Sequence, residues 1–149
     1  MHPRGTIFHH HNLVFHNGFT GNKYLVLLNT PDKKEPYLFV KTTSQKKHKT
    51  IIIGCQKKNS LFFIPKNTTF FKLDTWVQLY EYYLFSPSDF AGNQDIKKVG
   101  SLSAGATDEI VKCMLKTQAD DLPRLVKNLL QPPLKHSLEK LQSKFNRGR

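Results

Sequence analysis

Short apolar runs alternate with turn residues from the start of the chain to about residue 85. The runs are rich in β-branched and aromatic side chains, and Gly, Pro, Asn and Asp separate them, which is typical of β-strands. This pattern predicts five or six short strands, which we place at residues 6–10, 23–29, 36–43, 50–55, 61–65 and 75–85.

The hydrophobic period changes after residue 100. Ile110 and Met114 recur at helical spacing, Thr107 stands where an N-cap would be, and the acidic Asp108 and Glu109 follow it. Because acids stabilise the first turn of a helix, these residues predict a helix that begins at Thr107.

The C-terminal part of the chain holds two further helical patterns. Residues 120–130 predict a second helix with Pro123 near its start, where proline is tolerated. In the basic tail, one apolar stripe predicts an amphipathic helix, formed by Leu134, Leu138, Leu141 and Phe145. This tail could dock on the rest of the chain, on a second copy, on another protein or on a membrane surface.

Many short strands closed by a helix indicate a mainly β (α+β) fold, a small curled sheet or barrel of five to seven strands. A chain of 149 residues has the size of one domain. We assign residues 1–130 to the barrel with its closing helix, and residues 131–149 to the basic tail.

The net charge narrows the choice of partners. Twenty-three Lys and Arg against 11 Asp and Glu give a formal charge of +12, which favours a polyanion such as nucleic acid or an anionic membrane surface. No apolar run is long enough for a membrane span, and the N-terminus lacks the order of a signal peptide. We therefore expect a cytoplasmic protein in which Cys55 and Cys113 are free thiols, although a disulfide stays open.

Positive charge is concentrated between Glu35 and Asp74, where no acid occurs. Lysines over a phosphate backbone supply affinity, and interleaved aromatic rings stack unpaired bases. Core packing is the favoured interpretation for each individual phenylalanine. The lysines are Lys41, Lys46, Lys47, Lys49, Lys57, Lys58, Lys66 and Lys72, and the aromatic residues are Phe62, Phe63, Phe70 and Phe71.

Several polar residues have both a structural and a functional interpretation. Thr42 and Thr43 suit a strand, but they also present hydroxyl groups at the head of the lysine-rich segment. Glu81 could face water, pair with a lysine or accept a proton. Trp76 on the same run is expected in the core, where its indole N–H needs an acceptor.

Histidines gather before the second apolar run, at His9, His10, His11 and His16, and His48 follows the threonines. Imidazole accepts and donates protons near neutral pH, so His16 or His48 could transfer protons in catalysis. The consecutive histidines alternate faces if they lie on a strand, so that only some of them can share a site. Consecutive histidines rarely converge on one metal ion, and we expect no metal and no cofactor.

The order of four segments resembles the PemK and MazF toxins, small barrels related to the gyrase poison CcdB. The segments are "GNKYLVLLN", "YLFVKTTSQ", "FKLDTWVQLYEYYLFS" and "IKKVGSLSAGATDEIVKCML", and with the early "RGTIF" they span about residues 4 to 118. The resemblance implies an SH3-like barrel of PemK type. It also implies a toxin-like endoribonuclease that acts as a homodimer and is covered by an antitoxin.

The activity that the resemblance implies is metal-free cleavage of single-stranded RNA by the neighbouring 2′-hydroxyl. The family's arginine maps onto Lys23, which would hold the scissile phosphate, and its hydroxyl residue maps onto Thr42 or Thr43. Lysine offers a point charge where arginine offers a planar fork, so transition-state stabilisation should weaken. The alternative is a non-catalytic barrel that binds nucleic acid or a protein target. In the endoribonuclease interpretation we expect the lysines from Lys41 to Lys58 to follow the RNA backbone.

Overall fold

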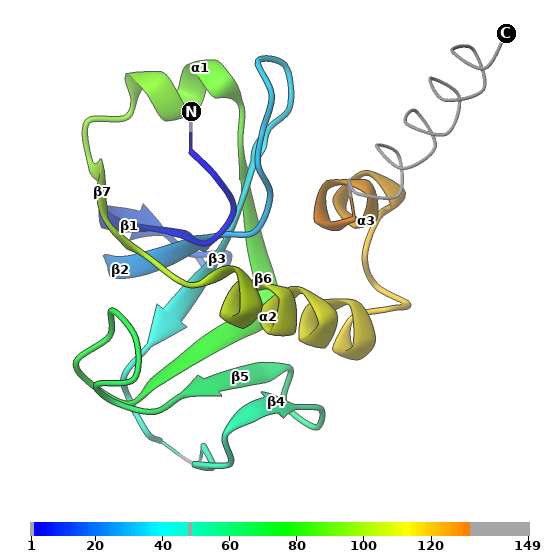
Figure 1. Cartoon of the computed structure of the whole chain (residues 1–149). Helices are drawn as coiled ribbons and strands as arrows, with labels where there is room; N and C mark the ends of the chain where they lie inside the picture. The colour runs from blue at the N-terminus through cyan, green and yellow to red at the C-terminus, as the bar shows by residue number, and fades with distance from the viewer. Residues whose placement is uncertain (1, 48, 132–149) are drawn as a thin grey trace, which may run out of the picture.

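The computed structural model describes residues 2–47 and 49–131, which form one seven-stranded antiparallel sheet and three helices (Figure 1). The strand order is β4-β5-β6-β3-β2-β1-β7. This confirms the mainly β fold with helices towards the C-terminus. The elements are β1 (Thr6–Val14), β2 (Thr20–Leu27), β3 (Tyr37–Thr43), β4 (Gly54–Gln56), β5 (Leu61–Ile64), β6 (Thr75–Phe85), α1 (Pro87–Gly92), β7 (Ile96–Ser101), α2 (Ala104–Thr117) and α3 (Arg124–Leu130).

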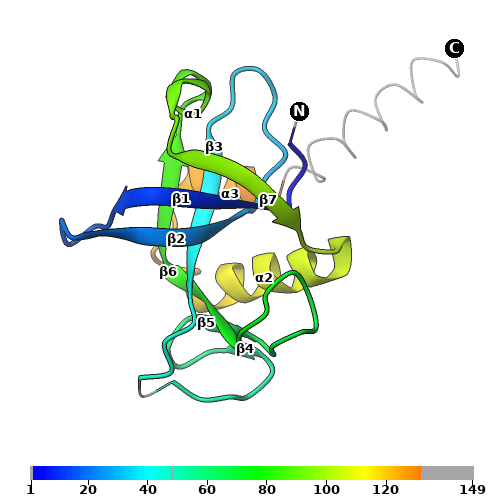
Figure 2. The same ribbon diagram turned by 90° about the vertical axis from the view of Figure 1, so that its left-hand side faces the viewer.

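Strand alternation divides the apolar residues between the two faces of the sheet. On β3, Leu38 and Val40 belong to one cluster with the buried residues of α2 and α3, whereas Phe39 belongs to a second cluster on the opposite face. Phe90 of α1 covers that second cluster and stacks on Tyr37, with ring centroids 4.0 Å apart. Figures 1 and 2 show α2 lying across the sheet and α1 at the end of β6.

The sheet curls, and its two outer strands are β4 and β7, which do not pair with each other in the described residues. Side chains of the β5–β6 loop, residues 65–74, help to cover this opening. The ring of Phe70 lies so close to Gly100 of β7 that a Cβ there would stand 2.6 Å from its Cδ2 atom. Glycine is required at position 100 for this contact.

The strand predicted at residues 50–55 is wrong, because only Gly54–Gln56 form a strand. The amide of Gln56 donates to the carbonyl oxygens of Thr50 and Ile52, at 2.9 Å each, and so holds the preceding segment as a loop. The three isoleucines, Ile51 to Ile53, are exposed there. The indole N–H of the buried Trp76 also donates to Thr50 O, at 2.7 Å, which confirms that this tryptophan is in the core with an acceptor.

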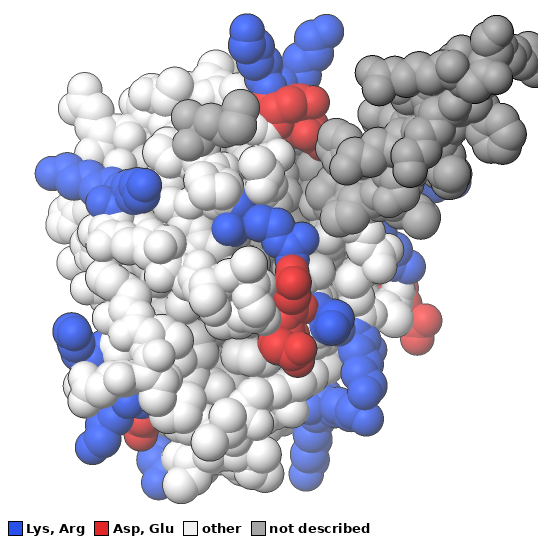
Figure 3. All heavy atoms as spheres, viewed as in Figure 1, with Lys and Arg blue, Asp and Glu red and all other residues white. Residues whose placement is uncertain are grey.

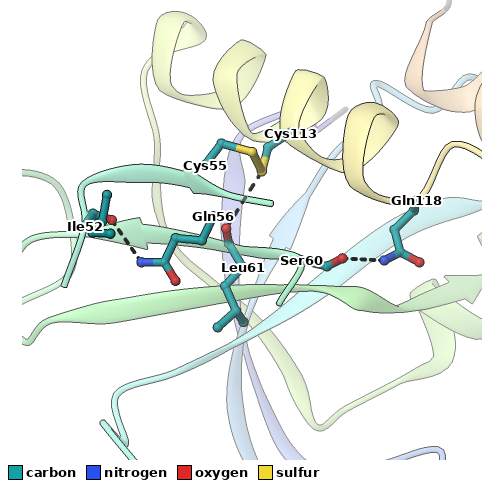
Figure 4. Close-up of a disulfide and its surroundings, with 7 residues drawn as sticks. All are labelled: Ile52, Cys55, Gln56, Ser60, Leu61, Cys113 and Gln118. Carbon is teal, nitrogen blue, oxygen red and sulfur yellow. Dashed lines mark hydrogen bonds between the residues drawn. A yellow bond between two sulfur atoms is a disulfide. The ribbon is translucent and has the colours of Figure 1, made fainter. Parts of the chain in front are cut away.

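The prediction of free thiols is also wrong. Cys55 on β4 and Cys113 on α2 form a disulfide that connects the outer strand to the helix above it (Figure 4). Gln118, just after α2, donates a hydrogen bond to the hydroxyl of Ser60 at 2.6 Å. This bond is a second connection, besides the disulfide, between α2 and the β4–β5 hairpin. Since disulfides are rare in reducing compartments, the expected cytoplasmic location loses the support of free thiols and stays a prediction.

Helix α2 begins earlier than predicted. Its N-cap is Ser103, whose hydroxyl accepts a hydrogen bond from the N–H of Ala106, at 3.1 Å. Thr107 lies inside the helix, fully buried, and its hydroxyl donates to Ser103 O. Ser103 and Thr107 are both hydroxyl residues, four positions apart, and the exposed Ser103 is the cap rather than the buried Thr107.

The helix predicted at residues 120–130 is present as α3, with Pro123 as its N-cap. Helix α1 and strand β7 were not predicted. The predicted amphipathic helix of the tail falls on residues outside the described part of the chain. Among the described residues, no helix is both long and apolar enough to cross a membrane.

Candidate nucleic-acid pocket

A pocket of about 680 Å³ opens where β2 begins and β3 ends, beside the loop that leads into β6. Lys23, Thr42 and Thr43 all line this pocket. The sequence suggested Lys23 as the residue that holds the scissile phosphate and the two threonines as the hydroxyl residues of the same site. The described lining residues are Asn22, Lys23, Tyr24, Thr42, Thr43, Ser44, Gln45, Phe70, Phe71, Lys72, Leu73 and Thr75.

The two threonines present different chemistry to this pocket. The Thr42 hydroxyl donates its proton to Tyr24 O, at 3.0 Å, so its oxygen is left with accepting capacity. The Thr43 oxygen accepts from the N–H of Gln45, at 3.2 Å, so its proton stays available to a ligand. Thr43 is therefore the better donor to a phosphate oxygen, and Thr42 the better acceptor.

Among the described residues, three aromatic side chains line the same pocket. Tyr24 and Phe70 lie with ring centroids 5.6 Å apart, and Phe71 packs edge-on against both of them. Phe71 is buried together with Phe62 and Phe63, as the core interpretation predicted, but Phe70 is half-buried and Tyr24 is exposed. Sequence reasoning missed Tyr24, since within a continuous apolar run nothing distinguishes it from a core residue.

Lys23 is the half-buried cation of the pocket. Partial burial lowers the pKa of its ammonium from the ordinary value, and the nearby charges of Lys41 and Lys49 lower it further. The ammonium lies 5.8 Å from the ring centroid of Phe15. Such a lysine gains more from an anionic ligand than a fully hydrated one, because its charge is incompletely solvated in the free protein.

A second polar cluster, formed by Lys41, Glu81, Tyr83 and His16, lies next to Phe15. Lys41 Nζ is 2.7 Å from a carboxylate oxygen of Glu81 and 4.6 Å from the Phe15 centroid. The Tyr83 hydroxyl donates to the same carboxylate, and His16 Nδ1 lies 3.7 Å from its other oxygen. Of the interpretations of Glu81, pairing with a lysine is the one that the structure confirms.

The pKa values in this cluster follow from burial and charge. Burial works to raise the pKa of Glu81, but the hydrogen bonds from Lys41 and Tyr83, together with the charge of Lys41, outweigh it, so the net pKa is lowered. Burial, then the hydrogen bond to Glu81, raises the pKa of Tyr83. Glu81 is therefore held as a carboxylate, in an ion pair rather than free to accept a proton.

Neither histidine suggested for proton transfer is found among the described lining residues. The His16 imidazole lies over Tyr83, with ring centroids 5.0 Å apart, and its Nε2 is 3.1 Å from Tyr82 O. The Phe15 ring lies near the ammonium of Lys41 in this cluster and near that of Lys23. His48 lies outside the described residues.

The lysines suggested for backbone contacts divide into three groups. Lys41 is buried and paired with Glu81, so its ammonium is not available to contact the RNA backbone. Lys46, Lys47 and Lys49 follow the pocket residue Gln45 directly, and Lys49 Nζ donates to Gln45 O. Lys57 and Lys58 precede Leu61, which pairs with Gln78, at the opposite end of β5 from the pocket. In the face shown in Figure 3, basic side chains likewise lie at several separate places around a broad uncharged area.

The histidine triplet does alternate along β1. His10 is buried, with Nδ1 2.8 Å from His11 O and Nε2 3.1 Å from the Asn93 amide nitrogen, so its two ring nitrogens already have partners. His9, on the other face, contacts Tyr24, with ring centroids 5.4 Å apart. The described residues contain no group of His, Cys, Asp or Glu that could hold a metal ion.

This arrangement offers a cation, a hydroxyl donor, a hydroxyl acceptor and an aromatic wall in one cavity, a combination suited to a nucleotide. Comparison of the chain with models of known protein families finds no match, and comparison with curated proteins finds none either.

Proposed function

We propose that this protein is a metal-independent endoribonuclease that binds single-stranded RNA in the pocket between β2, β3 and the β5–β6 loop. The observation that carries the proposal is the convergence of Lys23, Thr42 and Thr43 beside Tyr24 and Phe70. An aromatic wall favours unpaired bases, because the bases of a duplex are already stacked on one another. The order of segments that resembles PemK and MazF toxins supports the same activity.

In the proposed reaction, the 2′-oxygen forms a bond to phosphorus, and the bond from phosphorus to the 5′-oxygen breaks. The proton of the 2′-hydroxyl passes to a base, and the leaving oxygen receives a proton. Lys23 neutralises charge on the non-bridging oxygens, Thr43 donates to one of them, and Thr42 accepts from the sugar. His16 or His48 transfers the protons, which for His16 requires movement of the β1–β2 turn, the segment that carries Phe15 and His16, towards the pocket.

The direct test incubates purified protein with labelled single-stranded RNA in EDTA. Fragments with 2′,3′-cyclic phosphate ends support the proposed reaction. Lys23→Ala and Thr43→Ala should each reduce the rate by at least about ten-fold, the loss expected when one charge-stabilising group is removed. The assignment of these residues is wrong if both variants cut as fast as wild type.

One observation favours a second candidate, a barrel that binds RNA without cutting it. The described residues that line the pocket include no carboxylate and no imidazole, so a proton acceptor is not in place there. Binding of RNA in EDTA without fragments would support this alternative.

The proposal keeps the homodimer and the antitoxin that the family resemblance implies. Sedimentation equilibrium tests the dimer. Protection of RNA by the product of a neighbouring gene for a short acidic protein tests the antitoxin.

A further inference from the structure

A row of three side chains crosses the sheet from its outer strand towards the pocket. Lys97 on β7 stands opposite His9 on β1, and His9 stands opposite Tyr24 on β2. Residues directly opposite each other project from the same face of a sheet. The carbonyl of Tyr24 then accepts from Thr42 on β3, inside the pocket. We call Lys97, His9 and Tyr24 the cross-strand row.

The cross-strand row is accessible although its neighbours are core. Leu25 and Val26, which follow Tyr24, are fully buried, whereas Tyr24 is 41 % exposed. Lys97 is exposed and His9 is half-buried. Phe70, packed on Gly100 of β7, contacts the Tyr24 ring in an edge-on arrangement, with ring centroids 5.6 Å apart. Tyr24 is thus a supported aromatic surface at the rim of the pocket.

We infer that the cross-strand row is a second nucleotide subsite, in which the base next to the pocket stacks on the Tyr24 ring, the His9 imidazole contacts the edge of that base, and the phosphate contacts Lys97. This rests on the proposed RNA-binding function. Aromatic rings supply stacking that tolerates any base, and an ammonium supplies a phosphate contact. Three inter-strand spacings separate β7 from β3, roughly 14 Å in all, which is room for more than one nucleotide. The ligand class is therefore single-stranded RNA that runs from the pocket to the β7 edge.

Two ligands separate the subsite from the pocket. One is a fluorescent six-nucleotide RNA with 2′-O-methyl sugars, which lacks the attacking hydroxyl and stays intact, and the other is a nucleoside monophosphate as competitor. His9→Leu removes a ring contact to the base and Lys97→Gln removes a phosphate contact, and each should weaken hexamer binding by at least about five-fold. These two variants should leave binding of the monophosphate unchanged. Tyr24→Leu should weaken the binding of both the hexamer and the monophosphate, and Tyr24→Phe should bind both ligands like wild type.

The salt dependence gives a readout that loss of structure would not reproduce. Removing one phosphate contact to a single strand lowers the slope of log affinity against log salt by about 0.7. Lys97→Gln should show this change and His9→Leu should not. Tyr80→Leu and Lys33→Gln, at exposed positions on β6 and on the β2–β3 loop, serve as matched controls and should bind the hexamer like wild type.

The outcomes distinguish this inference from the proposed function. If wild type binds the hexamer and cuts RNA while His9→Leu and Lys97→Gln bind equally well, the subsite is wrong and the function stands. Failure of wild type to bind or cut any RNA overturns both. If the variants change the sedimentation coefficient but not the affinity, the cross-strand row is a contact between protein chains, and the inference is overturned.

Discussion

At the scale of single residues, the ion pair between Lys41 and Glu81 should be sensitive to substitution of either partner. Their side chains are only 10 % and 13 % exposed, so removing one partner leaves a charge with little water around it. Glu81→Gln should lower the free energy of unfolding by about 3 to 5 kcal/mol, the usual effect of breaking a buried pair. Urea unfolding at pH 7 measures this.

The double variant Lys41→Met with Glu81→Leu is the control, because it removes both charges and fills the space. It should be closer to wild type than Glu81→Gln is. Because the pKa of Glu81 is lowered in the folded state, its contribution is complete above the unfolded value of about 4.3 and is lost as pH falls through the folded value. Wild type should therefore lose more stability in acid than the double variant, and equal losses would contradict this account.

Lys23 illustrates a conflict between stability and function. Its lowered pKa means that the folded protein binds fewer protons than the unfolded chain between the two pKa values. The charged form of Lys23 lowers the free energy of unfolding at neutral pH. This loss should therefore disappear as pH rises towards the pKa of lysine in the unfolded chain, about 10.4. Lys23→Met should be more stable than wild type at pH 7, and the difference should narrow as pH rises through the lowered pKa of Lys23 in the folded state.

Thermal unfolding across this pH range checks the prediction for Lys23. Lys33→Met, at an exposed loop position, provides the comparison and should not change the pH dependence. An anion should reverse the order, because RNA in the pocket supplies the countercharge that Lys23 lacks. If Lys23→Met is less stable than wild type at every pH, the ammonium is not the strained group that its burial indicates.

At the scale of elements, the disulfide holds the short strand β4 against α2. The three residues of β4 pair only with β5, and a strand of this length contributes little on its own. Cys55 and Cys113 are 58 residues apart, a loop for which cross-linking stabilises by about 4 kcal/mol in the chain-entropy model. Reduction should therefore lower the free energy of unfolding by about 2 to 4 kcal/mol.

Urea unfolding with and without dithiothreitol measures this effect. A variant with Cys55→Ser and Cys113→Ala should resemble reduced wild type and should not respond to the reductant. A response of that variant, or none from wild type, would contradict the assigned role of the disulfide.

The elements also show which features could be predicted from sequence. Alternation located β3, β5 and β6 well, because their apolar residues are buried in a regular sheet. It failed at Ile51 to Ile53, since hydrogen bonds from the side chains of Gln56 and Trp76 hold the backbone of this segment out of the sheet. The disulfide could not be predicted from the sequence, because only the tertiary fold places α2 over β4.

The candidate site was predicted in part, for similar reasons. Lys23 and the two threonines were predicted from the resemblance of their segments to the toxin family, and they line one pocket because β2 and β3 are adjacent in the sheet. Lys41 was assigned to the RNA backbone because a strand pattern does not reveal which lysine has a buried acid beside it. The pairing of Lys41 with Glu81 depends on a bulge between β3 and β6, where the register shifts after Val40.

At the scale of the whole molecule, the net charge of +12 does not by itself say which lysines meet RNA. Lys46 and Lys47 follow the pocket residue Gln45, whereas Lys57 and Lys58 lie at the far end of β5. There, Lys57 is close enough to Lys116 to lower the pKa of the Lys116 ammonium. A short RNA in the pocket reaches only the first pair.

Two charge-matched double variants therefore test whether binding is local. Lys46→Gln with Lys47→Gln, and Lys57→Gln with Lys58→Gln, each remove two positive charges, so general attraction falls equally in both. The first should weaken binding of the intact six-nucleotide RNA and lower its salt slope by up to about 1.4, which corresponds to two phosphate contacts, and the second should change neither. Fluorescence anisotropy at several salt concentrations measures both quantities. Equal losses in the two variants would mean that RNA is attracted by the total charge of the protein rather than held at the pocket.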